Sequence, residues 1–324
     1  MPALYGVHVS LDAASADALA AWLEYSTDSA SSGPTIEVEI IADANCAPPV
    51  VLNLVLEEPF GWLGRTRTGL IVGGGDRAWF AIEGTPPRIR GALGKQGASE
   101  ATRDLLLAAL VVALRAIGVY AIHAAALARD DQALVLVGDS GAGKSTTAIA
   151  LVSAGCGFIG DDGFLIRERR GDVELLPLWS HFRLNDDSLA SFSALRPHIT
   201  RRAGDGKSQL DVRAAFPERH LPHWLGRKTV LFLERAIGKS SSLRPLSQAE
   251  AVGLLLAQSN ALSLECHPDP RRHLDLLARL VSVAKVARLE LGTEWLSEPV
   301  AAANRLLAQH LLFSRSVELH GEAS

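Results

Sequence analysis

A glycine-rich octapeptide constrains this chain more than any other feature of its sequence. Gly138-Asp139-Ser140-Gly141-Ala142-Gly143-Lys144-Ser145 fits the pattern G-x-x-x-x-G-K-[ST], known as Walker A. An apolar run, residues 133–137, stands directly before it, and a helix-forming stretch, residues 146–151, follows it. The sequence therefore predicts a buried strand, a tight loop and a helix, which is the context that the motif requires.

The chemistry of this pattern is that of a phosphate-binding loop. Glycines leave room for backbone N–H groups to converge on phosphate oxygens, and the start of a helix favours an anion. The Lys144 ammonium would reach the β- and γ-phosphates, and the Ser145 hydroxyl would ligate Mg²⁺. We therefore predict that nine residues bind a nucleotide: Gly138, Asp139, Ser140, Gly141, Ala142, Gly143, Lys144, Ser145 and Thr146.

Composition places the chain among globular proteins and argues against several other classes. Of its 324 residues, 48% are hydrophobic and 21% charged, and 32 basic residues against 36 acidic ones disfavour a nucleic-acid partner. The three cysteines include no CxxC pair, which indicates a reducing compartment. The first residues lack a basic segment followed by an apolar core, so we expect no secretory signal, and Arg115 and His123 interrupt the most apolar stretch of the chain. We therefore expect a cytoplasmic protein that does not span a membrane.

Short β-rich runs and turn signals fill the first hundred residues. The runs cover residues 35–42, 50–56, 68–72 and 78–82, and clusters of proline or glycine separate them. Gly73-Gly74-Gly75 is not followed by a helix, and no lysine or serine closes it, so it predicts a hairpin turn rather than a second phosphate loop. We expect a small α/β or mainly β domain over residues 1–100.

From residue 101 the pattern changes to alternating helices and strands. Helices are predicted over residues 105–114, 145–153, 247–256 and 272–284, and strands over residues 119–128, 133–137, 157–159 and 229–233. Residues 173–184 are predicted to form a longer extended region. Ser247 and Glu250 have the spacing of a helix cap. Because alternation of this kind is typical of an α/β sheet, we expect a P-loop domain over residues 101–297. Residues 298–324 would form a C-terminal helix and tail, and the sequence leaves open whether that helix contacts a second subunit in a homo-oligomer.

Two adjacent carboxylates follow the predicted strand at residues 157–159. Gly160-Asp161-Asp162-Gly163 has the composition of a turn, but the carboxyl ends of neighbouring strands meet at one edge of an α/β sheet. We therefore expect Asp161 and Asp162 to face the phosphate loop. One carboxylate would hold Mg²⁺ and the other would accept the proton of an attacking hydroxyl. His123, in the preceding apolar strand, is either a core residue or a partner of these carboxylates.

These motifs occur together in a known family. His123-Ala124, the octapeptide and Asp161-Asp162 have the order and spacing of the HPr kinase/phosphorylase catalytic domain, so residues 119–166 resemble that family. The resemblance implies an α/β fold with a P-loop kinase domain of the HPr kinase and phosphoenolpyruvate carboxykinase type. The smaller N-terminal α/β domain does not resemble the regulatory domain of HPr kinases.

The resemblance also implies roles for single residues. Asp161 would be the base toward an acceptor serine, with His123 close to it, and Asp162 would serve the metal together with Ser145. Two further residues, Arg183 and Lys207, lie where related sequences place cationic side chains toward the phosphates.

Two departures from the family pattern bear on the substrate. Thr146 stands where HPr kinases usually carry a glutamate, and the acidic pair is not followed by the Gly-Leu-Gly-rich stretch that is associated with phosphorolysis. Both argue against HPr as the acceptor. In size and layout the chain is similar to kinases of lasso-peptide pathways, which phosphorylate a serine of a precursor peptide, and to kinases of free serine.

The sequence thus favours a kinase that uses ATP and Mg²⁺ and phosphorylates a serine hydroxyl in a small protein or peptide. Two alternatives remain. One is a small-molecule kinase, and the other is a non-catalytic module that binds a peptide when a nucleotide orders its loops. The preference for ATP or GTP and any phosphorylase activity stay open.

Overall fold

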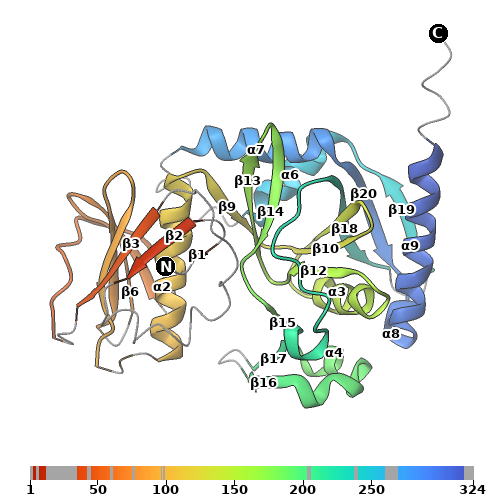
Figure 1. Cartoon of the computed structure of the whole chain (residues 1–324), viewed down its shortest axis with the longest axis horizontal. Coiled ribbons are helices and arrows are strands. Elements are labelled where there is room, and N and C mark those ends of the chain that lie inside the picture. Colours follow the sequence, from red (N-terminus) through yellow and green to blue (C-terminus); the bar gives the residue numbers. More distant parts are fainter. Residues whose placement is uncertain are drawn as a thin grey trace, which may run out of the picture. The chain divides into compact units, whose positions relative to one another are not determined.

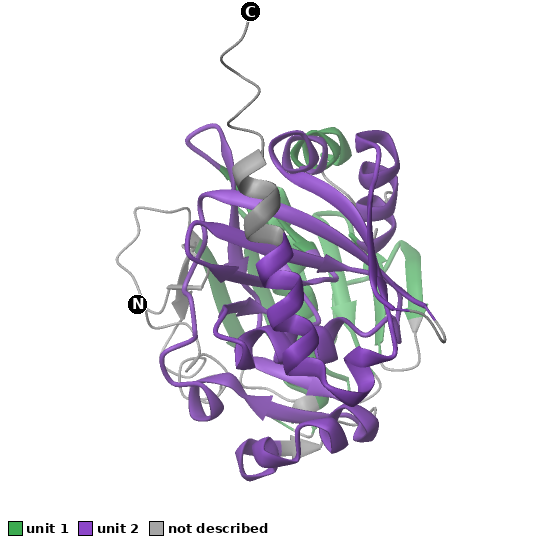
Figure 2. Ribbon diagram, turned by 90° about the vertical axis from the view of Figure 1, so that its right-hand side faces the viewer, with its two compact units in different colours: residues 1–121, 165–168, 259–276 green, residues 122–164, 169–258, 277–324 purple. Residues whose placement is uncertain are grey.

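The computed structural model describes residues 3–4, 7–11, 35–41, 45–58, 61–74, 77–95, 97, 99–202, 206–236, 240–259 and 269–316. The chain forms two compact units, which Figures 1 and 2 show. Unit 1 contains residues 1–121, 165–168 and 259–276, and unit 2 contains residues 122–164, 169–258 and 277–324. This division differs from the expected boundaries at residues 100 and 297. The helix that follows residue 100 packs in unit 1, and the C-terminal helix packs in unit 2.

Unit 1 contains an eight-stranded sheet with the order β1-β2-β3-β8-β7-β6-β5-β4. Neighbouring strands from β4 to β8 are antiparallel, and Gly73 pairs with Trp79 across the turn between β6 and β7. The hairpin predicted at the glycine cluster is therefore confirmed, although Gly75 lies outside the described residues. The strands are Ala3–Leu4, Val7–Leu11, Thr35–Ile41, Asn53–Glu58, Gly61–Arg65, Gly69–Gly73, Trp79–Glu83 and Arg88–Ala92, in the order β1 to β8.

Helix α2 (Glu100–Ala116) covers this sheet. The Ser99 side chain caps it by accepting a hydrogen bond from the Thr102 backbone N–H. The buried residues Leu106, Ala109 and Ala113 recur at helical spacing, and α2 packs against β6, β7 and β8. The change of pattern at residue 101 therefore marks a helix of unit 1 rather than the start of the P-loop domain.

Unit 2 contains a six-stranded sheet with the order β12-β10-β11-β18-β20-β19. Strands β11, β18 and β20 are parallel, and β10 is antiparallel to both β11 and β12. It follows that β12 runs in the same direction as β11, so four carboxyl ends meet at one edge of the sheet. The strands are β10 (Ala125–Arg129), β11 (Gln132–Val137), β12 (Gly157–Gly160), β18 (Arg227–Arg235), β19 (Ser242–Pro245) and β20 (Lys285–Leu291).

Two helices of unit 2 pack beside this sheet, one on its strands and one on the first helix. Helix α3 (Lys144–Ser153) packs against β10, β11 and α9 (Pro299–Ser316), which assigns the C-terminal helix to unit 2. A smaller sheet with the order β15-β17-β16 stands beside α3. The other elements are β14 (Asp172–Pro177), β15 (His181–Leu184), α4 (Asp186–Ser191), η2 (Ser193–His198), β16 (Ile199–Arg202), β17 (Ser208–Asp211), α5 (Val212–Ala215), α6 (Gln248–Gln258) and α8 (Glu294–Ser297).

The run at residues 119–128, predicted as one strand, is interrupted. It forms β9 (Val119–Ile122) and β10, with His123 and Ala124 between them. The extended region predicted at residues 173–184 contains β14 and β15. The chain passes from one unit to the other within β9, within β13 (Phe164–Arg169) and within α7 (Pro270–Val283).

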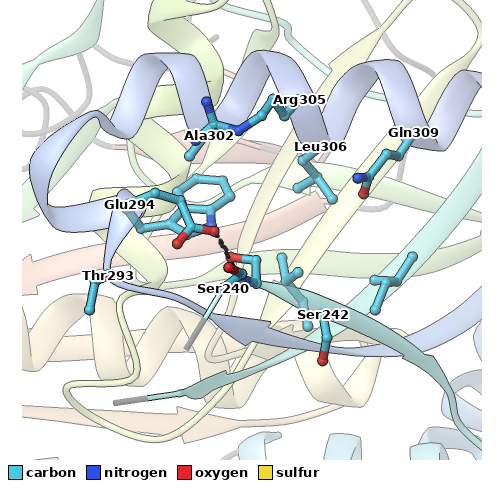
Figure 3. A pocket seen from close by; sticks show the side chains of 12 residues that line it. Ser240, Ser242, Thr293, Glu294, Ala302, Arg305, Leu306 and Gln309 are labelled. Carbon is cyan, nitrogen blue, oxygen red and sulfur yellow. Dashed lines mark hydrogen bonds between the residues drawn. The ribbon is translucent and has the colours of Figure 1, made fainter. Parts of the chain in front are cut away.

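A cavity of about 540 Å³ lies in unit 2 beside α9 (Figure 3). Residues at the starts of β19 and α8, together with α9, form its walls. Across the described part of the chain, no helix is long and apolar enough to cross a membrane.

Candidate active site

The strand, loop and helix predicted around the octapeptide are present. β11 ends at Val137 and α3 begins at Lys144. Gly141 has a φ of 81° and Gly143 a φ of 101°, values that side chains larger than glycine rarely adopt. A Cβ built on Gly141 would meet no atom within 4 Å, so the loop is open on that side. Backbone N–H groups at the start of α3 have no side-chain cap and are available to an anion.

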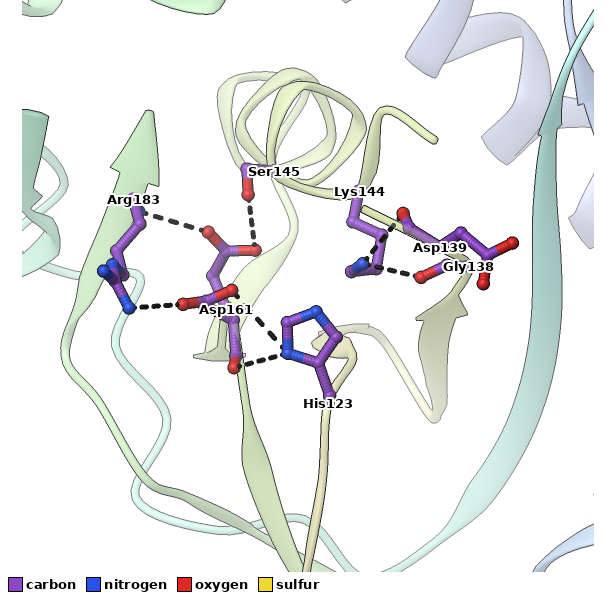
Figure 4. Close-up of polar contacts among 8 residues, drawn as sticks. His123, Gly138, Asp139, Lys144, Ser145, Asp161 and Arg183 are labelled. Carbon is purple, nitrogen blue, oxygen red and sulfur yellow. Dashed lines mark hydrogen bonds and ion pairs between the residues drawn. The ribbon is translucent and has the colours of Figure 1, made fainter. Parts of the chain in front are cut away.

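The Lys144 ammonium group points back into its own loop. Its Nζ donates to the backbone oxygens of Gly138 at 2.6 Å and Asp139 at 3.2 Å (Figure 4). Burial lowers the pKa of Lys144, and the carboxylates of Asp161 and Asp162 oppose that shift. The charge is thus held inside the glycine-rich loop, where a phosphate group would replace the two carbonyl oxygens as its partner.

The two adjacent aspartates point in different directions. Asp162 has a φ of 58°, in the left-handed region that Asp tolerates better than most residues. The Asp161 carboxylate is fully buried and accepts a hydrogen bond from the Ser145 hydroxyl at 3.1 Å. The backbone N–H of Arg183 donates to its other oxygen at 3.3 Å. The predicted placement of this carboxylate beside the phosphate loop is confirmed.

Asp162 lies between His123 and Arg183. Its carboxylate accepts a hydrogen bond from Arg183 Nη1 at 2.8 Å, and His123 Nδ1 lies 3.7 Å from its other oxygen (Figure 4). His123 Nδ1 also lies 3.2 Å from the Asp162 backbone oxygen, which can only accept, so this nitrogen carries the proton. Burial lowers the pKa of His123, and the nearby Lys144 lowers it further. The imidazole is therefore a neutral hydrogen-bond donor near pH 7.

This geometry reverses the pairing that the family resemblance implies. His123 contacts Asp162 rather than Asp161, and Ser145 contacts Asp161 rather than Asp162. Successive side chains at the end of a strand point to different sides, so only one of the two carboxylates reaches Ser145.

The carboxyl group of Asp161 has a strongly shifted pKa. Burial raises its pKa from 3.8 to about 6, and the neighbouring Asp162 charge raises it as well, while the hydrogen bond from Ser145 acts in the opposite direction. The folded protein therefore binds a proton at Asp161 more tightly than the unfolded chain does. Its contribution to stability is complete below about pH 4 and is lost as the pH rises through about 6.

We expect Asp161→Asn to stabilise the protein at pH 8 when nucleotide and metal are absent. The amide carries no charge, and it can accept from the Arg183 N–H while donating to the Ser145 hydroxyl. The difference between pKa values of 3.8 and about 6 corresponds to about 3 kcal/mol. Urea unfolding of the wild type and the variant at pH 4 and pH 8 measures the difference in their free energies of unfolding. This difference should appear only at the higher pH. An equal stability difference at both values would contradict the assignment.

Gln258 joins two parts of the site that are far apart in the sequence. Its backbone oxygen accepts from the His123 N–H at 2.8 Å, and its side-chain Nε2 donates to the Asp139 carboxylate at 2.9 Å. It is the last residue of α6, whose predicted cap, formed by Ser247 and Glu250, is confirmed. The sequence carries no local signal for Gln258, because its partners lie in β9–β10 and in the phosphate loop.

The remaining predicted residues lie around this centre. Arg183 contacts both aspartates, and the charge of Lys207 lowers the pKa of His123 and of Lys144, which places both cations at the site. Ser140 is exposed at the tip of the loop, and Ala142 packs against the core of unit 2. The Thr146 hydroxyl shares a hydrogen bond of 2.7 Å with Ser188 of α4, so it is turned away from a bound phosphate.

The oxygen atoms at this site fit a magnesium ion. The Ser145 hydroxyl and the Asp161 carboxylate adjoin one another, and Mg²⁺ prefers one or two carboxylates completed by phosphate oxygens and water. Within the described residues, no group of three or more His, Cys, Asp and Glu side chains that could hold a metal occurs.

Comparisons with known proteins give little beyond this geometry. No protein-family model matches the chain, and no curated protein matches its sequence. A solved structure of the HPr(Ser) kinase/phosphatase from Coxiella burnetii matches 60% of this chain and 98% of its own, at 12% identity and a TM-score of 0.34. A likeness this weak carries no statement about fold or activity, so the function has to be argued from the site.

Proposed function

We propose that the protein is a kinase that transfers the γ-phosphoryl group of ATP to a serine hydroxyl of a small protein or peptide, with Mg²⁺ as cofactor. One observation carries the proposal. The Ser145 hydroxyl at the end of the phosphate loop is hydrogen-bonded to the buried Asp161 carboxylate, and a second carboxylate, Asp162, adjoins it. A phosphate-binding loop beside two carboxylates is an arrangement suited to phosphoryl transfer.

The chain supplies phosphate binding through its loop. The amides at the start of α3 and the Lys144 ammonium would neutralise the β- and γ-phosphate oxygens. Ser145 and Asp161 would hold Mg²⁺, which would offset the negative charge of the phosphates. Lys207 would add positive charge on the side of His123.

Asp162 is better suited than Asp161 to accept the proton of the attacking hydroxyl. Asp161 is fully buried, whereas the Asp162 side chain is 17% exposed and so accessible to an acceptor. As the serine oxygen bonds to the γ-phosphorus, the bond to the β-phosphate oxygen breaks, ADP leaves and the hydroxyl proton passes to Asp162. His123 and Arg183 would hold this carboxylate in place through the contacts they make with it.

Intact-mass spectrometry tests the proposal. The protein is incubated with ATP, Mg²⁺ and a library of short serine-containing peptides, alongside the same library with every serine replaced by alanine. A gain of about 80 Da on serine peptides alone, the mass of a phosphoryl group, is the expected result. The same gain on free serine would favour a small-molecule kinase. ATP binding without a product of either kind would favour a nucleotide-dependent binding module.

A further inference from the structure

The cavity beside α9 combines an apolar floor with a polar rim. Leu243, Leu289 and Leu306 supply apolar surface, and Thr293 and Glu294 stand at one end (Figure 3). The rim is held in place by Ser241, which donates from its backbone N–H to Glu294 at 2.9 Å. Ser241 Oγ accepts from the Gly292 N–H and from Trp295 Nε1, each at 2.9 Å. These bonds tie the loop after β20 to the residues at the start of β19.

This cavity adjoins the same sheet edge as the phosphate loop. Leu291, the last residue of β20, lies 3.0 Å from the position that a Cβ of Gly143 would take. The next residue, Gly292, donates to Ser241, and Thr293 and Glu294, which follow it, line the cavity. Two strand spacings separate β11 from β20, which places the cavity about 10 Å from the loop along the edge.

The order of the strands determines which way a bound nucleotide would lie along this edge of the sheet. Asp161 and Asp162 follow β12, two strands from β11 on the other side. Phosphoryl transfer requires the γ-phosphate to face these carboxylates. The opposite end of the nucleotide therefore leaves the loop toward β18 and β20, where the cavity lies.

On the basis of the proposed function, we infer that this cavity binds the nucleoside end of the nucleotide. The leucine side chains would pack against the faces of the base. The Glu294 carboxylate would accept a hydrogen bond from an amino group of the base or from a ribose hydroxyl. Its hydrogen bond from Ser241 lowers the pKa of Glu294, so it is an anionic acceptor at neutral pH.

The affinities of Mg·ATP and of magnesium-bound inorganic triphosphate, measured by calorimetry, test this inference. Triphosphate fills the phosphate loop but lacks the nucleoside. Thr293→Trp places a large side chain in the lining of the cavity and should weaken ATP binding about 10- to 100-fold because the base loses apolar contact, without changing triphosphate binding. Glu294→Gln keeps an acceptor for the Ser241 N–H and should weaken ATP binding by about tenfold through loss of the charge.

The control for Thr293→Trp is a tryptophan placed outside the cavity. Ala308→Trp adds the same side chain to an exposed position of α9 outside the cavity and should leave both affinities unchanged. Inosine triphosphate and 2′-deoxy-ATP separate the base amino group from the ribose hydroxyl as the partner of Glu294. Equal wild-type affinity for ATP and triphosphate would overturn the inference alone, as would a Thr293→Trp variant that changes only the KM of the acceptor. A wild type that binds neither ligand would overturn the proposed function.

Discussion

Asp162→Asn should slow phosphoryl transfer by about 10²- to 10⁴-fold while nucleotide affinity stays close to that of the wild type. The amide occupies the same volume but cannot take the hydroxyl proton. Asp162 does not contact Lys144 or Ser145 in the hydrogen bonds of the site, so the phosphate loop should keep its geometry. Transfer is measured as phosphopeptide formed per minute at saturating ATP, and affinity by calorimetry.

Measuring Asp161→Asn in the same way distinguishes a proton-accepting carboxylate from a metal-binding one. If Asp162 is the base and Asp161 a metal ligand, the Asp161 variant should require a higher Mg²⁺ concentration, and the Asp162 variant should not. Asp187→Asn, which removes an exposed carboxylate from α4, serves as the control for the change in net charge. Wild-type transfer by Asp162→Asn, together with an unchanged Mg²⁺ requirement in Asp161→Asn, would remove both carboxylates from the reaction.

Lys144→Met should weaken both nucleotide binding and transfer, by about 10²- to 10³-fold in transfer. Methionine keeps the length of the side chain and removes the charge that would face the β- and γ-phosphates. The variant should fold, because Gly138 is only partly buried and Asp139 is exposed, so the two carbonyls that lose Lys144 can turn to water. Lys95→Met, at an exposed position of unit 1, is the matched control. Unchanged affinity for both ATP and triphosphate in Lys144→Met would refute the role of the loop.

The phosphate loop and the elements on either side of it could be predicted because their patterns lie within a short stretch of sequence. The loop needs glycine where φ is positive, at Gly141 and Gly143, and the strand and helix around it have clear apolar patterns. Asp161 could be placed near Ser145 because the carboxyl ends of β11 and β12 share an edge.

The pairing within the site could not be predicted. Asp161 and Asp162 are chemically identical neighbours, and they differ only in the partners that the fold brings to them, Ser145 for the first and His123 for the second. His123 breaks its strand because its N–H bonds to Gln258, a residue distant in sequence, and no turn residue marks that break. Long-range partners of this kind leave no periodic pattern.

The fold was predictable to a similar degree. Alternating strands and helices indicated an α/β protein, and mixed sheets with helices are present. The domain boundary was misplaced because an apolar helical pattern does not tell which sheet the helix covers, and α2 covers the sheet of unit 1. Strands β5 and β8 were missed because their glycines and arginines interrupt the apolar pattern.

The division of the chain into interleaved stretches limits how this protein can be shortened. A truncated protein starting at residue 122 would still carry residues 165–168 and 259–276, which belong to unit 1. Leu165 and Ile166 are fully buried in the whole chain and would lose the unit in which they are packed. Such a fragment should therefore be prone to aggregation. For the same reason, replacing unit 1 by a different module would require three segments of the gene to be exchanged together.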